Sequence, residues 1–255
     1  MPRESKKATV NFRWRLWLGL VAVGVACVSS AMAGLKVRQF ALTDAQFTLS
    51  RDHKDALTIQ GMKFTSRSKV LRVFSSDFGR SVFSVPLAER RRRLLAIDWV
   101  EDASVSRIWP DRLVVRIRER TPVAFVFFRS GVLLIDSRGI LLDPPPQAQF
   151  AFPVLSGVKE EETEDQRRER VRCLARVQEE LGYMAKDVSE VNASDPDNLR
   201  IVAQVEHRTV ELIMGDNNFG RRYLNFLSHY PEIEKHSPNA KRFDLRLDDR
   251  ITAED

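Results

Sequence analysis

The chain has 255 residues, with 41 Lys and Arg against 35 Asp and Glu, which gives a net charge of +6. A hydrophobic fraction of 43% and a charged fraction of 30% exclude a disordered chain and a multi-spanning membrane protein. Its two cysteines, Cys27 and Cys173, are far apart, which excludes a disulfide scaffold and a cysteine-based metal cluster. Residues 1–15 alone carry a net charge of +4, so the basic total does not indicate nucleic-acid binding.

Residues 16–35 form an uncharged, mostly apolar run that is long enough to cross a bilayer. As a helix with a rise of about 1.5 Å per residue, this run spans roughly 30 Å. Trp14 and Trp17 lie at its amino end, where indoles favour the membrane interface, and a basic tail precedes it. The pattern predicts a cytoplasmic tail at 1–15, a transmembrane helix at 16–35 and all later residues outside the cytoplasm.

A cleaved signal peptide is the alternative for the same segment. Ala31-Met32-Ala33 resembles a cleavage site, and the basic tail resembles the start of a signal peptide. The apolar run exceeds the usual signal-peptide core of about 7–15 residues, which favours an uncleaved anchor.

A first extracytoplasmic domain is predicted at residues 56–124. A short alternating strand begins at Leu57, and helices follow over 70–78 and after Pro86. Two strands are expected at 99–108 and 112–120, joined by a turn at Pro110. The resulting order is β-α-α-β-β, a small α+β domain.

A second domain, mostly antiparallel β with flanking helices, is predicted at residues 125–255, so that the whole chain is α+β. The apolar pattern predicts helices at 160–182 and 218–230. It predicts strands at 122–129, 132–143, 199–205, 209–214 and 242–247.

The two predicted domains carry opposite charge. Residues 57–125 have a net charge of +7 and residues 126–255 a net charge of −6. Surface charge without a role is one explanation. A basic domain that attracts anionic lipid headgroups or an acidic partner is the other. Residues 90–93 are four consecutive arginines, which point in different directions on a helix and predict a solvated face rather than a nucleic-acid site.

The sequence contains no recognised catalytic, metal or cofactor motif. The four histidines lack metal-ligand spacing, and no nucleophile elbow, phosphate-binding loop or dinucleotide fingerprint occurs. Cys173 lies among arginines, but a packed helix cysteine is favoured because no histidine is near it in sequence. We therefore predict no enzyme, no cofactor, no metal and no small-molecule substrate.

Three motifs resemble those of a known family. Residues 99–113 read Trp-Val-x-x-Ala-x-Val-x-Arg-x-Trp-Pro-Asp-Arg-Leu, and residues 113–124 read Leu-x-Val-x-Ile-x-Glu-Arg-x-Pro-Val-Ala. Residues 243–247 read Phe-Asp-Leu-Arg-Leu. Together with the basic tail and the single apolar segment, these motifs resemble the FtsQ/DivIB family of bacterial cell-division proteins, whose first extracytoplasmic domain is a POTRA domain.

The resemblance implies a non-enzymatic divisome scaffold in the cytoplasmic (inner) membrane at the division septum. It implies binding to FtsB and FtsL and a role in controlling the septal peptidoglycan synthase, FtsW with FtsI. It further implies that an extended partner segment adds to the exposed edge of the last strand. Here the matching partner-binding positions are Arg221, Arg222, Leu224, Arg246, Leu247 and Asp248.

This chain departs from the family pattern at two of those places. Leu247 stands where Tyr is common, and Asp249-Arg250 stands where small residues are usual. A periplasmic POTRA-type chaperone or outer-membrane assembly factor is the rival function. One POTRA copy and the modest chain length argue against it.

Overall fold

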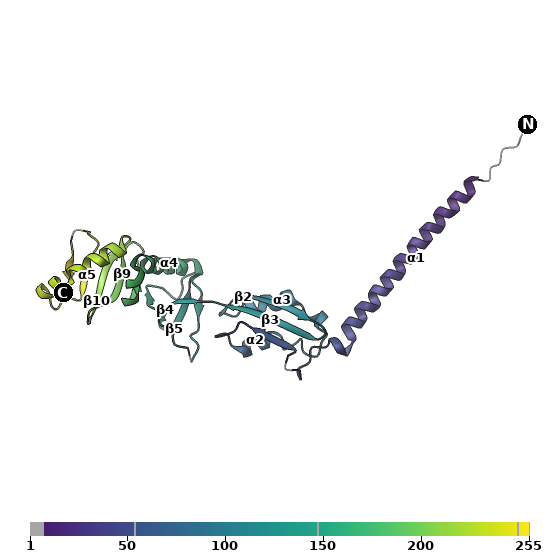
Figure 1. Cartoon of the computed structure of the whole chain (residues 1–255), viewed down its shortest axis with the longest axis horizontal. Helices are drawn as coiled ribbons and strands as arrows, with labels where there is room; N and C mark the ends of the chain where they lie inside the picture. Colours follow the sequence, from purple (N-terminus) through teal and green to yellow (C-terminus); the bar gives the residue numbers. More distant parts are fainter. Residues whose placement is uncertain (1–7, 54, 147, 249, 255) are drawn as a thin grey trace, which may run out of the picture. The chain divides into compact units, whose positions relative to one another are not determined.

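The computed structural model describes residues 8–53, 55–146, 148–248 and 250–254 (Figure 1). The chain divides into two compact units. The first contains residues up to 62 together with 66–94 and 103–117, and the second contains 63–65, 95–102 and the residues from 118 onward. Residues 1–7 of the predicted basic tail lie outside the described residues.

Helix α1 (Ala8–Thr43) is the long N-terminal element of the first unit. Its part from Trp17 to Thr43 is long and apolar enough to cross a membrane, and none of its most apolar window is buried within the protein. The helix therefore extends beyond the uncharged run at 16–35, because the polar residues on either side of that run are also compatible with helical structure.

The rest of the first unit forms a three-stranded sheet with helices and short 3-10 turns. The sheet order is β1-β3-β2, with β1 parallel to β3. Its core contains Val70 of α2, Phe74 directly after α2, Leu94 of α3, and Leu113 and Val115 of β3, all fully buried. The elements are η1 (Ala45–Phe47), β1 (Leu57–Gln60), α2 (Arg67–Val73), η2 (Val82–Ser84), α3 (Leu87–Leu95), β2 (Val100–Ile108) and β3 (Arg112–Glu119).

A buried ion pair links α3 to the turn that follows α2. Arg90 of α3 donates hydrogen bonds of 2.6 and 2.8 Å to the carboxylate of Asp77, and the Asp77 side chain is fully buried. The bond to Asp77 raises the pKa of Arg90. The prediction that all four arginines at 90–93 form a solvated face is therefore wrong for Arg90, which points inward toward a partner 13 residues earlier.

The second unit is built on a mixed nine-stranded sheet with the order β12-β11-β10-β9-β8-β7-β4-β5-β6. Three neighbouring pairs are parallel, and the remaining pairs are antiparallel. The strands are β4 (Pro122–Phe128), β5 (Gly131–Asp136), β6 (Leu141–Leu142), β7 (Val154–Ser156), β8 (Val188–Asn192), β9 (Leu199–Val205), β10 (Arg208–Gly215), β11 (Arg242–Asp244) and β12 (Thr252–Glu254).

Helices α4 (Glu164–Leu181) and α5 (Phe219–His236) pack on this sheet, and η3 (Gly182–Asp187) follows α4 (Figure 1). Thr163 begins α4 with a capping box, in which its hydroxyl accepts from the backbone N–H of Gln166. Apolar side chains of both helices form one core with strands β8 to β11, including Leu174, Phe226 and Phe243.

Two predicted element boundaries differ from the structure at the C-terminal end. Helix α5 continues through Pro231 to His236 rather than ending at residue 230, because Tyr230 and Ile233 on either side of the proline still pack on the core. The predicted strand 242–247 ends at Asp244, and the chain then turns back to form β12.

Candidate partner-binding surface

The free edge of the sheet nearest the C-terminus belongs to β12, not to the strand that contains residues 243–247. Strand β11 pairs on one side with β10 in parallel and on the other with β12 in antiparallel register, Phe243 opposite Ala253. The expectation that this last predicted strand offers an exposed edge is therefore wrong, because the chain's own residues 252–254 occupy that edge. All three residues of β12 are exposed, and β12 is the end strand of the sheet.

Helix α5 positions two of the predicted partner-binding arginines beside the start of the C-terminal segment. Its first turn is held by a 2.7 Å bond from the backbone N–H of Phe219 to the carboxylate of Glu180 on α4. Gly220 lies directly against the backbone carbonyl of Glu180, so that a larger residue there would separate the two helices. This close approach fixes the position of the first turn of α5 and hence the direction in which Arg221 and Arg222 project from it.

Arg222 joins α5 to two other segments of the second unit. Its Nε donates to Asp248 Oδ1 at 3.0 Å, and its Nη1 donates to the backbone carbonyl of Met214 at 2.6 Å. Only 11% of its side chain is exposed. Arg222 thus holds the turn after β11 against α5, and its guanidinium is mostly committed to internal bonds.

Arg221 is the exposed member of the pair. Its side chain is 77% exposed, and its Nη1 lies 4.0 Å from Asp248 Oδ2. An exposed pair at that distance contributes little to folding, so the charge of Arg221 remains available to a partner carboxylate.

Arg246 is directed at Asp244 instead of at the helix. Its guanidinium donates to both carboxylate oxygens of Asp244, with a shortest distance of 2.6 Å, and its backbone N–H donates to the same group at 3.0 Å. Chiefly through the side-chain hydrogen bond from Arg246, the pKa of Asp244 is held below its usual value. The backbone bond and the positive charges of Arg246 and Arg222 add to this effect. This bidentate pair fixes the chain direction after β11.

The remaining apolar positions are solvent-exposed. Leu247 is 57% exposed and Leu224 is 51% exposed. Leu247 lines a hollow of about 270 Å³ beneath the turn, whereas Leu224 lies on α5 outside that lining. The other residues of this hollow are Arg221, Arg222, Asn225, Leu245, Asp248 and Ile251.

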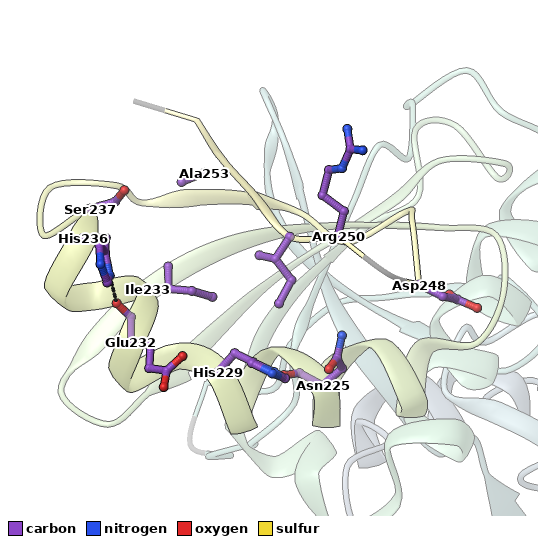
Figure 2. A pocket seen from close by; sticks show the side chains of 10 residues that line it. Asn225, His229, Glu232, Ile233, His236, Ser237, Asp248, Arg250 and Ala253 are labelled. Carbon is purple, nitrogen blue, oxygen red and sulfur yellow. Dashed lines mark hydrogen bonds between the residues drawn. The ribbon is translucent and has the colours of Figure 1, made fainter.

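A second hollow of about 590 Å³ adjoins the first, with Asn225, Asp248 and Ile251 lining both. Figure 2 shows side chains of α5 along one side, including His229 and His236, and the C-terminal segment with Arg250 and Ala253 along the other. We call the two together the C-terminal hollow. It lies between α5 and the segment that ends in β12.

The structure therefore brings four of the six predicted residues to one hollow: Arg221, Arg222, Leu247 and Asp248. Leu224 and Arg246 are not part of its lining. Asn225, Leu245 and Ile251 also line this hollow but were not predicted. Ile251 directly follows Asp248-Asp249-Arg250, and an apolar residue beside such a charged run is a signal that could have indicated it. Asp249 lies outside the described residues.

Among the described residues, no three His, Cys, Asp or Glu side chains are grouped so that they could hold a metal ion. His229 and His236 each place Nδ1 2.9 Å from a backbone carbonyl of α5, those of Asn225 and Glu232 respectively. Their contacts are those of helix-surface histidines. The C-terminal hollow therefore combines a strand edge, one exposed leucine, Leu247, and one exposed arginine, Arg221.

The family comparisons agree with the fold. A family model described as POTRA domain, FtsQ-type, matches residues 55–120. A cell division protein FtsQ from Koribacter versatilis is 32% identical over 256 residues, an alignment that covers 98% of this chain and 72% of that protein. The chain belongs to the FtsQ family. FtsQ from Shewanella oneidensis is 26% identical, with 96% of this chain and 87% of the relative covered.

A comparison with solved structures also finds a match to part of the chain. It is the major extracytoplasmic domain of the cell division protein DivIB from Geobacillus stearothermophilus, 23% identical, covering 48% of this chain and 98% of that domain, with a TM-score of 0.28. The predicted membership in the FtsQ/DivIB family and the predicted α+β fold with a POTRA domain are confirmed.

Proposed function

We propose that this protein is a non-enzymatic divisome scaffold that binds FtsB- and FtsL-type proteins through the C-terminal hollow and the edge of β12. Membership in a family of cell-division proteins supports a divisome role. The observation that carries the binding site is the unpaired edge of β12 directly beside a hollow that contains an exposed arginine and an exposed leucine. An extended partner segment would add to this edge through main-chain hydrogen bonds.

The chemistry of the hollow favours a partner segment with one acidic and one apolar residue. Arg221 supplies a positive charge with little competition, since its contact with Asp248 is long and exposed. Leu247 supplies apolar surface. A carboxylate paired with Arg221 and an apolar side chain on Leu247 would fix the register of the added strand.

The proposed topology follows from α1. Residues 1–15 form a cytoplasmic tail, and residues 16–35 form the membrane-spanning core of the helix. The POTRA domain at 56–124 and the β-rich domain at 125–255 lie outside the cytoplasm, and the protein gathers at the division septum. Through FtsB and FtsL it would act on FtsW and FtsI. A fluorescent fusion that fails to gather at midcell would contradict this location.

Titration of the full chain in lipid nanodiscs with an FtsB–FtsL complex tests the binding site. We expect Arg221→Glu to weaken binding by roughly tenfold or more, as for a central interface charge. Arg172→Glu is the matched control, since Arg172 is an exposed arginine on α4 with its own carboxylate neighbour, and it should bind like the wild type. Equal affinity of Arg221→Glu and wild type, with unchanged circular dichroism, would remove Arg221 from the site.

A further inference from the structure

An exposed aromatic group in the first unit is not used by the proposed partner-binding surface. Its centre is Phe47, which is 6% exposed and whose ring centroid lies 5.7 Å from that of Phe40, 5.3 Å from that of Phe83 and 5.7 Å from that of Trp109. Phe83 and Trp109 also touch each other at 5.1 Å. We call Phe40, Phe47, Phe83, Ile108 and Trp109 the aromatic tip.

The outer members of the tip are open to solvent. Trp109 is 67% exposed, Phe40 is 53% exposed and Ile108 is 43% exposed. Ile108 is the last residue of β2, and Trp109 follows it in the turn to β3, so both lie at one end of the sheet. Contiguous exposed apolar surface of this kind marks an interaction site rather than an isolated exposed residue.

The tip is tied directly to the C-terminal end of α1. The hydroxyl of Ser81 donates a 2.7 Å hydrogen bond to the backbone carbonyl of Ala41, and Thr48 forms an isolated bridge with Ser81. Two successive ring contacts of 5.7 Å place the Trp109 ring no more than about 11 Å from that of Phe40 on α1. The tip therefore lies near the depth at which α1 ends.

The length of α1 sets that depth. The apolar part, Trp17–Thr43, has 27 residues, and a helix of that length spans about 40 Å against about 30 Å for the hydrocarbon core. If Trp17 marks the inner interface, roughly the last seven residues of α1, Phe40 among them, lie at the level of the outer headgroups. Tryptophan favours this zone because its ring is apolar and its N–H is polar.

We propose that the aromatic tip lies in the headgroup region of the outer leaflet and holds the POTRA domain against the bilayer surface. This inference rests on the proposed membrane anchoring by α1. Charged neighbours of the tip carry both signs. Arg107 donates to the backbone carbonyls of Val82 and Val85, whereas Asp111 lies 3.8 Å from His53. The contact is therefore mainly apolar and insensitive to salt, unlike a purely electrostatic contact with anionic lipid.

Fluorescence quenching in vesicles tests the position of Trp109 in the full chain. The background variant carries Trp14→Phe and Trp17→Phe, which leaves Trp109 and the buried Trp99 as the tryptophans of the chain. A third substitution, Trp109→Phe, keeps an aromatic ring and isolates the Trp99 signal. Both variants are reconstituted in phosphatidylcholine–phosphatidylglycerol vesicles that contain lipid brominated near the headgroup end or near the methyl end of the acyl chains.

We expect the Trp109 emission to be blue-shifted, quenched more by the shallow bromines than by the deep ones, and unchanged in high salt. The difference between the two variants gives this emission. Absence of bromine quenching, equal quenching by deep bromines, or loss of quenching in salt would each overturn the inference. Flotation with the vesicles in high salt separates the two proposals: a chain that does not float refutes the anchor, whereas one that floats without quenching refutes only the tip.

Discussion

Leu247 provides the most direct test of the C-terminal hollow as a binding surface. Its side chain is 57% exposed in the free chain, and full burial of a leucine contributes about 1.5–3 kcal/mol. If a partner covers the exposed part, that part contributes about 0.9–1.7 kcal/mol, so Leu247→Ser should raise the dissociation constant for FtsB–FtsL roughly 4- to 20-fold. Because the side chain is largely exposed, the same change should lower the free energy of unfolding by less than about 1 kcal/mol.

The measurement uses the full chain in nanodiscs, with the FtsB–FtsL complex titrated by biolayer interferometry. Phe127→Ser is the matched control, since Phe127 is 58% exposed on β4 and lies outside the lining of the C-terminal hollow. It should bind like the wild type. If Leu247→Ser and Phe127→Ser change the dissociation constant equally, or neither changes it by more than twofold, then burial of Leu247 by the partner is refuted.

Three further predictions concern the stability of the folded units. Arg90→Met leaves the buried carboxylate of Asp77 unpaired and should cost about 3–5 kcal/mol in urea unfolding, whereas the double variant with Asp77→Leu should recover most of that loss; no recovery would contradict the argument. Burial raises the pKa of Glu119, whereas hydrogen bonds from residues 63–65 lower it. The hydrogen bonds together outweigh burial, so the pKa of Glu119 lies below its usual value. Its contribution to stability is therefore present above the unfolded pKa of about 4.3 and lost as the pH falls through the folded value. The melting temperature of the wild type should accordingly fall more steeply with acid than that of Glu119→Gln, and parallel curves would refute this. Gly157→Ala, at φ +84°, drives a Cβ into facing backbone and should destabilise by well over 1 kcal/mol. Gly79→Ala, at φ +82° with open space around it, should cost less in the same denaturant titration.

Much of the fold could be predicted from local pattern. The alternation in residues 113–117 places Leu113, Val115 and Ile117 inward, and all three are buried. Such patterns predict strands and helices because the apolar face of each element is the face that becomes buried in the core.

The parts that could not be predicted depend on a distant partner. Arg90 lies among identical residues, and only the position of Asp77 in space selects it for burial. Strand β12 reads as Thr-Ala-Glu, with no buried face, and its strand conformation comes from pairing with β11. Glu119 clamps the backbone N–H groups of residues 63–65, more than 50 positions earlier, which no local pattern indicates.

The two ends of the nine-stranded sheet differ in how well they can accept a further strand. At one end, β6 has two residues and is followed by Pro144, Pro145 and Pro146, which have no N–H to donate to another strand. At the other end, β12 contains no proline. Head-to-tail stacking of copies requires both edges to accept a strand, and the prolines leave the residues after β6 without the N–H groups that such an addition would use. The two edges of this sheet are thus unequally suited to accept a further strand, and the edge at β12 is the better suited of the two.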